Sequence, residues 1–221
     1  MRWLSDGEVE RIWAAAEQLG PEYEIRIHLG LDLCLRKVEM FRLKISDFWR
    51  AGNGHGKIRV LGKGRDGGKE AYIPFHPDTE YYLERYLNWR EEQFRKAEER
   101  GLRIEEEARE SLLIWYREDM GIGKEHYTTM DNRLTRISRL SGVRFSYHDL
   151  RRTGARFYWE QGWPLVAIQH LLRHEKIETT IRYLGLRYDI VEEALWAQRG
   201  RGAGRPLPLQ VGKTNSVIFR I

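Results

Sequence analysis

The most informative segment of the chain covers residues 147–153 and reads Tyr147-His148-Asp149-Leu150-Arg151-Arg152-Thr153. His148 and Arg151 are three residues apart, so on a helix they project from one face and could bind one phosphate together. By the same reasoning we do not expect Arg152 to share that face. Two residues downstream complete a set able to break and rejoin a phosphodiester bond: His174, and Tyr183 nine residues after it.

The composition is that of a globular protein with a slightly basic balance. The chain has 221 residues, enough for one large domain or two small ones. It carries 38 Lys and Arg against 33 Asp and Glu, and this net charge of +5 suits a polyanionic partner. The single cysteine, Cys34, excludes an internal disulfide and a multi-cysteine zinc site. No apolar run approaches the length of about 20 residues that crosses a bilayer, and no secretory pattern opens the chain. We therefore expect a protein without a membrane partner, soluble and intracellular, in the cytoplasm or nucleoid.

The hydrophobic patterns predict mostly helices. Residues 5–8 read Ser-Asp-Gly-Glu, a capping box expected to open a helix that runs to about Leu19. A second helix is expected to carry Arg36 at the end of an apolar stripe formed by Ile25, Leu29 and Leu33. Further helices are expected over residues 77–101, 128–140, 147–161 and 164–172, with Tyr183 in another helical stretch.

Strand patterns are few and short. Residues 57–61 and 70–75 alternate between apolar and polar, and the glycine-rich segment 62–69 between them predicts a hairpin turn. Residues 111–116 could form a short apolar strand or a connector in the core. The expected fold class is mainly α with a small antiparallel β-sheet (α+β).

The order of these residues resembles the signature of the tyrosine recombinase, or phage integrase, family: an arginine, a lysine, His-x-x-Arg, a His or Trp, and a nucleophilic tyrosine. The matching positions are Arg36, Lys63, His148, Arg151, His174 and Tyr183. The family's Leu-Gly-His, Ile-x-Thr-Thr and Tyr resemble residues 171–183, where Arg173 replaces the commoner glycine. Residues 30–40 resemble the family's Gly-Leu-Arg-x-x-Glu with two extra residues before Arg36, and Glu39 follows that arginine by three. Tyr188 is a nearby competitor, but the interval from His174 favours Tyr183.

Arginine and lysine suit different steps of phosphoryl transfer. Attack on a phosphodiester builds negative charge on the nonbridging oxygens, and the two planar guanidiniums of Arg36 and Arg151 could hold it with paired hydrogen bonds. A lysine on a hairpin turn could protonate the leaving 5′ oxygen as general acid. Lys63 is the matching residue, and Lys69 is its rival.

The nucleophile needs help from its neighbours. A phenol with an ordinary pKa of about 10 is a weak nucleophile at neutral pH. His148 could accept the proton of Tyr183. We expect His174 to position the phosphate or the phenol, because its family counterpart can be a tryptophan. Glu39 is expected to orient a basic residue, with a plain helix-surface role as the alternative.

The resemblance implies the catalytic-domain fold of tyrosine recombinases over residues 1–199, without the N-terminal core-binding domain that such enzymes usually carry. Residues 200–221 are expected to form a flexible basic linker and a C-terminal tail, whose last part, 210–221, is either a strand or disordered. The implied function is a site-specific DNA recombinase or integrase that acts through a 3′-phosphotyrosyl intermediate without a metal, ATP or another cofactor.

The implied partners are double-stranded DNA and further copies of the chain. We expect a tetramer on paired DNA sites, with the tail contacting a neighbour. Whether the tyrosine acts on DNA held by its own chain or by a neighbour stays open. Two other functions also remain: a type IB topoisomerase-like nicking-closing enzyme, and a noncatalytic DNA-binding module of the same fold.

Overall fold

The computed structural model describes residues 2–62 and 69–186, together with 210–211 and 217–218. The chain divides into two units, Met1–Gly185 and Leu186–Ile221. In the second unit, the short strands β6 (Gln210–Val211) and β7 (Val217–Ile218) pair antiparallel. The expected boundary at residue 199 lies outside the described residues.

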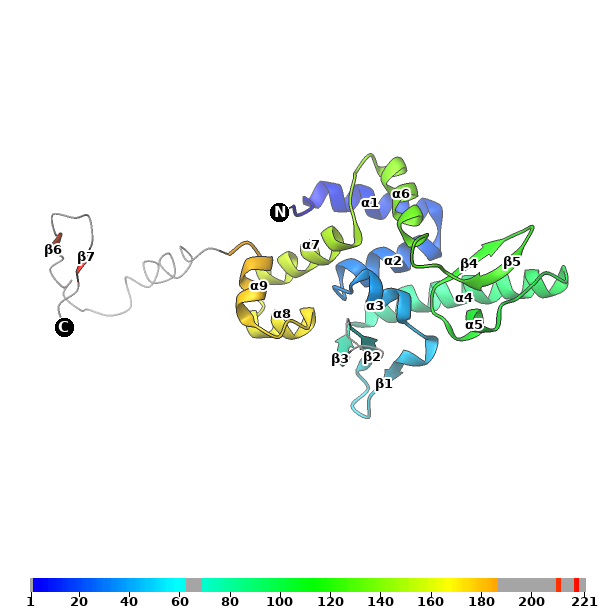
Figure 1. Ribbon diagram of the computed structural model, residues 1–221, viewed down its shortest axis with the longest axis horizontal. Coiled ribbons are helices and arrows are strands. Elements are labelled where there is room, and N and C mark those ends of the chain that lie inside the picture. The colour runs from blue at the N-terminus through cyan, green and yellow to red at the C-terminus, as the bar shows by residue number, and fades with distance from the viewer. Residues whose placement is uncertain (1, 63–68, 187–209, 212–216, 219–221) are drawn as a thin grey trace. The chain divides into compact units, whose positions relative to one another are not determined.

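The first unit is built mainly from helices. They are α1 (Asp6–Leu19), α2 (Pro21–Leu31), α3 (Lys37–Arg42), α4 (Pro77–Glu99), α5 (Glu106–Glu110), α6 (Met130–Ser141), α7 (Tyr147–Glu160), α8 (Leu165–Leu172) and α9 (Ile177–Tyr183), with a 3-10 turn, η1 (Ile45–Asp47). One antiparallel sheet has the order β1 (Phe48–Arg50), β2 (Gly56–Leu61), β3 (Glu70–Phe75), and a second pairs β4 (Ile114–Arg117) with β5 (Gly121–Lys124). The expected mainly α fold with small antiparallel sheets is confirmed (Figure 1).

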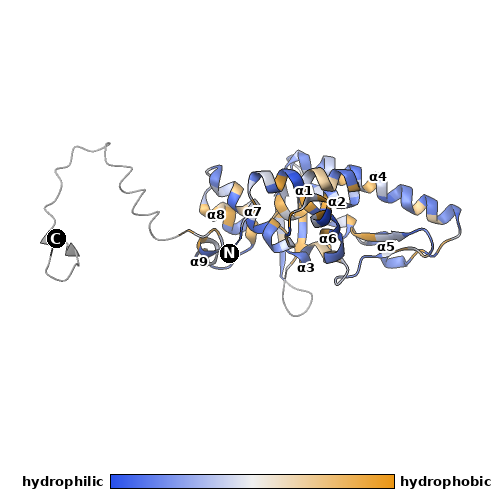
Figure 2. Ribbon diagram, turned by 90° about the horizontal axis from the view of Figure 1, so that it is seen from above, coloured by the Kyte–Doolittle hydropathy of each residue, from blue (hydrophilic) through white to orange (hydrophobic). Residues whose placement is uncertain are grey.

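Helix α2 forms the centre of the unit. All its residues from Tyr23 to Leu31 are buried, and it contacts α1, α4 and α7. Figure 2 shows apolar residues concentrated around α2, while the far part of α4 is mainly hydrophilic. The core also holds charge: Arg26 of α2 is fully buried and pairs with Glu125, whose side chain is 2% exposed. In the part of the chain that the structure describes, no helix combines the length and the apolar character of a membrane span.

The start of α1 follows the sequence closely, but the end of α2 does not. Ser5 caps α1 and exchanges hydrogen bonds with Glu8, as the capping box predicts. The expectation that Arg36 continues the apolar stripe of α2 was wrong. The backbone leaves the helix after Leu31, and Cys34 takes a left-handed conformation with a φ of 48°. The amide of Leu35 then donates to the carbonyl of Leu29 at 3.0 Å, which closes a wide turn.

Helix α7 approaches the end of α2 so closely that only glycine fits at the contact. A Cβ atom on Gly154 would lie 1.7 Å from the carbonyl oxygen of Leu31 and 3.1 Å from the sulfur of Cys34. Leu4 also contacts α7, since its amide donates to the hydroxyl of Thr153 at 2.9 Å. This close approach brings Arg151, three residues before Gly154, against the turn that follows α2.

The predicted hairpin is present, with Ile58 of β2 opposite Ile73 of β3. A third strand, β1, which the sequence did not indicate, pairs with the other edge of β2. Residues 111–116 include the start of β4, so the strand alternative holds for their second half.

Candidate active site

A buried carboxylate lies at the centre of what we call the arginine cluster: Arg36, Arg151, Arg173 and Glu39. The Glu39 side chain is completely buried. Its Oε1 accepts from Nη1 of Arg36 at 2.7 Å and from Nε of Arg173 at 3.1 Å, and its Oε2 accepts from Nη2 of Arg173 at 2.6 Å. Burial acts to raise the pKa of Glu39, but Arg173 and Arg151 outweigh it and hold that pKa below its ordinary value. Glu39 is therefore an anion at neutral pH.

The start of α3 fixes Arg36 relative to Glu39. Arg36 is the N-cap residue of α3, with extended backbone, and its amide donates to Oε2 of Glu39 at 2.7 Å. An acidic side chain in the first helical turn also satisfies the positive end of the helix dipole. Glu39 thus lies beside Arg36, as their spacing of three residues in the sequence suggested. The cause is the capping of α3, and not a continuation of the apolar stripe of α2.

Arg151 is held by backbone carbonyls from two distant segments. Its guanidinium donates to the carbonyl of Cys34, in the turn after α2, and to the carbonyl of Leu172, at the end of α8. Arg36 donates to the same Leu172 carbonyl at 3.3 Å. Burial, then Arg173 and Arg36, lower the pKa of Arg151 to about 10, so this side chain, 1% exposed, stays cationic at neutral pH.

Tyr183 lies beside both histidines and two arginines. Its ring centroid is 5.4 Å from that of His148 and 5.3 Å from that of His174, both edge-on. The guanidinium carbon of Arg151 lies 5.9 Å from the ring centroid, and that of Arg152 lies 5.1 Å away. Within the described part of the chain the buried Tyr183 hydroxyl has no hydrogen-bond partner. Burial raises the pKa of Tyr183, and Arg151 only partly opposes this effect.

His148 shares its helix face with Arg152, so the expectation that Arg152 cannot share it was wrong. Nη2 of Arg152 lies 2.9 Å from Nε2 of His148. Residues four apart are helix neighbours as much as residues three apart. Arginine has no acceptor, so this ring nitrogen must be the acceptor. Desolvation and the Arg152 charge lower the pKa of His148, which is therefore neutral at pH 7.

His174 is also held in its neutral form. Burial, followed by the charges of Arg151 and Arg36, lowers its pKa to about 4. Its Nδ1 lies 3.1 Å from the hydroxyl of Thr180, one turn before Tyr183 on α9. The side chain of Gln169 donates to the backbone carbonyl of His174 at 3.1 Å. These contacts fix the short link between α8 and α9.

Of the two lysines considered as general acid, only Lys69 lies within the described residues. Lys63 lies outside the described residues, as does Tyr188. Lys69 is 78% exposed, and its Nζ is 3.5 Å from Oε1 of Glu175. It lines a cleft of about 650 Å³ together with Arg36, Arg173 and His174. Among the described residues, no group of three or more His, Cys, Asp or Glu side chains could hold a metal ion.

The structure thus brings five of the six sequence-identified residues into one neighbourhood: Arg36, His148, Arg151, His174 and Tyr183. Two further arginines of this neighbourhood, Arg152 and Arg173, were missed. Arg152 could have been found from its spacing of four residues from His148, because residues four apart also share a helix face. Arg173 gave a signal as the residue that replaces the family's commoner glycine, but the sequence did not indicate what its side chain contacts.

The first unit has the fold of a tyrosine recombinase catalytic domain. The crystal structure of XerA recombinase superimposes with a TM-score of 0.65, at 20% identity over 91% of this chain and 66% of that one. The pre-cleavage complex of XerH site-specific recombinase bound to difH substrate gives 0.63, at 21% identity over 87% of this chain and 53% of that one.

Sequence comparison gives the family. Residues 2–189 match the profile of the phage integrase family, and the chain belongs to that family. The tyrosine recombinase XerC of Oceanobacillus iheyensis is 28% identical over 176 residues, which cover 79% of this chain and 52% of the relative. The chain thus spans about half the length of this curated relative.

Proposed function

We propose that the chain is a site-specific DNA recombinase that cleaves and rejoins DNA strands through a 3′-phosphotyrosyl intermediate on Tyr183. The observation that carries this proposal is the position of the Tyr183 ring, which lies beside the rings of both His148 and His174 and within 6 Å of the Arg151 guanidinium carbon. All these contacts lie within one chain, which supports attack by Tyr183 on DNA held by its own protomer.

In this proposal Arg36 and Arg151 bind the scissile phosphate. Each guanidinium carries five N–H donors, more than the carbonyl and carboxylate contacts described above use. Arg151 is fixed by Cys34 and Leu172 before DNA arrives, so little reorganisation is needed when negative charge develops on the phosphate. Glu39 would keep Arg36 oriented through its two hydrogen bonds to that residue.

The proton of Tyr183 has to leave when the phenol attacks. The raised pKa of Tyr183 means that the phenol is protonated at neutral pH, and we assign neutral His148, whose ring lies beside the phenol, as the acceptor of its proton. His148 Nε2 already accepts from Arg152, so that hydrogen bond must yield as the proton transfers. His174, which shares contacts with Thr180 and the Tyr183 ring, would position the phenol or the phosphate.

Atoms and charges balance without an external energy source. The Tyr183 oxygen bonds to phosphorus, the bond to the 5′ oxygen breaks, and Lys63, or in its place Lys69, supplies the proton to that leaving oxygen. A 5′ hydroxyl of the partner strand then attacks the phosphotyrosyl link and gives its proton to the lysine, while His148 returns a proton to the released Tyr183 oxygen. The bond energy stays in the covalent link, and we therefore propose that neither ATP nor a metal is required.

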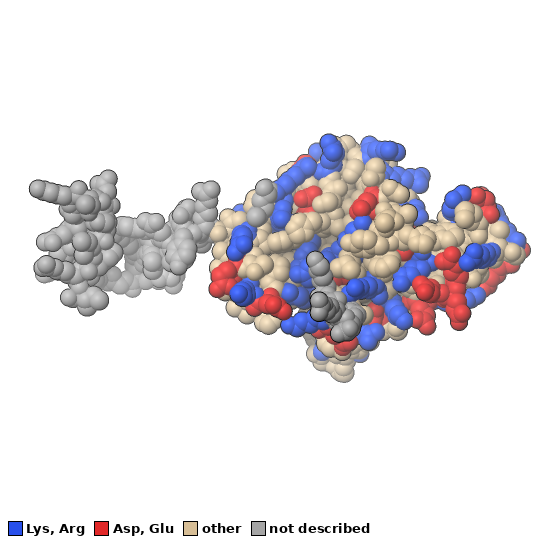
Figure 3. All heavy atoms as spheres, in the orientation of Figure 1, with Lys and Arg blue, Asp and Glu red and all other residues tan. Residues whose placement is uncertain are grey.

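The proposed partner is double-stranded DNA. Figure 3 shows Lys and Arg side chains over the central part of the face that carries α3 and α7, whereas acidic side chains gather at the end formed by α4 and α5. Binding through phosphate contacts should weaken steeply as salt rises. We further propose a tetramer on paired sites, with residues 1–199 as catalytic domain and residues 200–221 as a tail that contacts a neighbour.

The test is a nicked suicide duplex, which traps the covalent complex because the strand beyond the cleavage point diffuses away. A labelled protein–DNA adduct is expected with the unmodified chain and with Tyr188→Phe, the matched control. The adduct should be absent with Tyr183→Phe. If Tyr183→Phe still forms the adduct, the assignment of the nucleophile is wrong. Resolution of a synthetic Holliday junction supports recombination, whereas relaxation of supercoils without resolution indicates a topoisomerase-like enzyme.

A further inference from the structure

The backbone strain in the described residues is concentrated at the arginine cluster. Outside glycine, the described residues with positive φ are Cys34, at 48°, and Arg173, at 54°. Side chains with a Cβ disfavour this left-handed region, and a helix that ends in it usually has glycine there. Arg173 stands at that position, directly after α8, and the carbonyl of Cys34 accepts hydrogen bonds from both Arg151 and Arg173. Strained residues of this kind persist only where their surroundings compensate for the strain.

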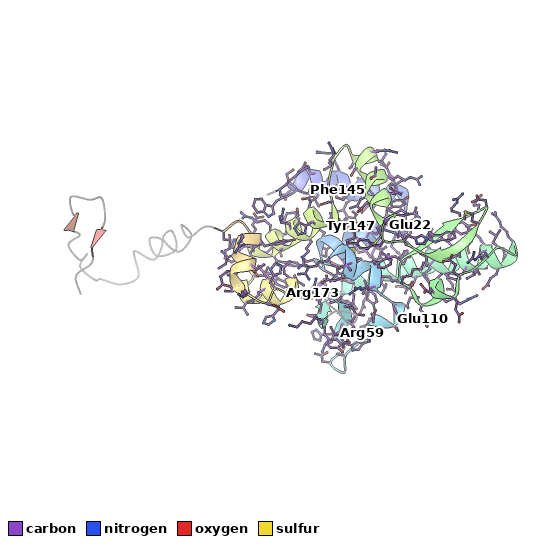
Figure 4. The ribbon with its side chains drawn as sticks, viewed as in Figure 1. Glu22, Arg59, Glu110, Phe145, Tyr147 and Arg173 are labelled. Carbon is purple, nitrogen blue, oxygen red and sulfur yellow. The ribbon has the colours of Figure 1, made fainter. Side chains whose placement is uncertain are left out.

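The side chain of Arg173 supplies that compensation. It is 10% exposed and turns back from the end of α8 towards α3, where Figure 4 labels it. It binds both oxygens of Glu39, at 3.1 and 2.6 Å, and donates to the carbonyls of Cys34, at 3.0 Å, and Leu171. Glycine would satisfy the backbone equally well but would remove all of these contacts.

The contacts of Arg173 balance the negative charge of Glu39. Glu39 is buried beside the place where an anionic phosphate would bind, and an uncompensated carboxylate there would repel it. Arg151 approaches Glu39 only to 3.7 Å and makes its hydrogen bonds to carbonyls instead. Arg173 instead binds both oxygens of the Glu39 carboxylate. The arginine cluster contains three guanidiniums and one carboxylate, so its net charge is +2.

We propose that Arg173 is a positioning residue of this site: its guanidinium neutralises Glu39, which leaves the positive charges and free donors of Arg36 and Arg151 available to the scissile phosphate. This inference rests on the proposed strand-cleavage function. It also explains why the residue before His174 departs from the glycine that is commoner in the family.

The test compares Arg173→Gly with Arg173→Lys and with Arg103→Ala. Glycine suits the left-handed backbone, so Arg173→Gly should fold, and Arg173→Lys retains the charge without binding both Glu39 oxygens. Arg103, 79% exposed near the acidic end of α4, is the matched control for losing one positive charge. Single-turnover cleavage of the suicide duplex at saturating DNA is expected to slow by about tenfold or more in Arg173→Gly, with a smaller loss in Arg173→Lys and none in Arg103→Ala.

Substitution of Glu39 tests whether Arg173 acts by neutralising that carboxylate. If Arg173 acts by neutralising that carboxylate, Glu39→Gln should recover part of the rate lost in Arg173→Gly, although neither residue then carries charge. A double variant slower than Arg173→Gly by the full effect of Glu39→Gln alone would overturn the inference.

A readout that does not depend on cleavage is the titration of His174, followed by NMR in the full chain. Arg173 is one of the charges that lower the pKa of His174, so that pKa should rise in Arg173→Gly and stay unchanged in Arg103→Ala. Inorganic phosphate should also perturb the His174 signal less in Arg173→Gly. An unmoved His174 pKa, or cleavage within about twofold of the unmodified chain, refutes the role of Arg173. Absence of any covalent adduct in the unmodified chain refutes the proposed function instead, and the NMR arms still decide whether Arg173 controls the charge of the arginine cluster.

Discussion

Replacing Gly154 by alanine tests whether the contact between α7 and the end of α2 holds the arginine cluster together. Helix propensity alone predicts that Gly154→Ala stabilises the protein by about 1 kcal/mol, because glycine is a poor helix former. The structure predicts the opposite. The new Cβ would lie 1.7 Å from the Leu31 carbonyl oxygen and 2.7 Å from its carbon, both of them backbone atoms that cannot rotate away. Real contacts essentially never fall below 3.0 Å, so the helices would have to separate by about 1.3 Å.

Overpacking of this kind costs about 1–3 kcal/mol and more where the neighbour is backbone, so we expect Gly154→Ala to lower the free energy of unfolding by about 3 kcal/mol. For a chain of this length that corresponds to a fall in Tm of about 6–12 °C. The displacement should also carry Arg151 away from Cys34 and slow formation of the covalent adduct. Guanidinium denaturation would measure the loss, with Gly7→Ala in α1 as the control, because the side-chain atom nearest to a Cβ added there would be Arg11 Nη1 at 3.9 Å. A Gly154→Ala protein as stable as the unmodified chain would refute the close packing of α7 on α2.

Three further outcomes follow from buried groups. Glu125→Gln leaves fully buried Arg26 without its counter-charge and should cost about 3–5 kcal/mol in a denaturation experiment, whereas Glu110→Gln, which removes an exposed carboxylate, should leave the free energy of unfolding nearly unchanged. Tyr183→Phe removes a buried hydroxyl that has no partner in the described residues, so the unfolding free energy should stay the same or rise slightly while the covalent adduct disappears; a clear loss of stability would show that the hydroxyl is hydrogen-bonded. His174 has a pKa of about 4 in the folded chain against an ordinary value of 6.5, so the unfolded chain takes up the proton first and stability should fall as pH drops from 6.5 to 4. After allowance for partial exposure, this loss should be about 1 kcal/mol, and His174→Asn should flatten the curve in that window; parallel curves would contradict the assignment.

Local sequence signals were sufficient for the elements that carry His148, Arg151 and Tyr183. Ser146 and Asp149 form a capping box at the start of α7, and the helix then follows its hydrophobic period. The hairpin of β2 and β3 was equally visible, because alternation and a glycine-rich turn are both local properties.

The turn after α2 could not be predicted in the same way. An apolar stripe continues from Leu29 to Leu33, and nothing local distinguishes a longer helix from a chain that turns into the core. The left-handed Cys34 is stabilised by Arg151 and Arg173, which lie 117 and 139 residues further along the chain. Long-range contacts of this kind override local propensity.

Strand β5 was missed for a similar reason. Strand β5 has only four residues, two of which are Gly121 and Gly123. Both are required by close neighbours: added Cβ atoms would lie 1.9 Å from the Arg103 carbonyl oxygen and 2.5 Å from the Trp115 ring. Packing therefore places this strand where its intrinsic preference would not.

The burial of Cys34 has a practical consequence for spectroscopy. Its thiol has no exposed surface, and burial raises its pKa to about 12, so it should not react with maleimide or disulfide reagents while the chain is folded. It is also the one cysteine in the sequence. A cysteine introduced at exposed Arg139 would then be the single labelled position, and a fluorophore or spin label could report on DNA binding without first replacing the native thiol.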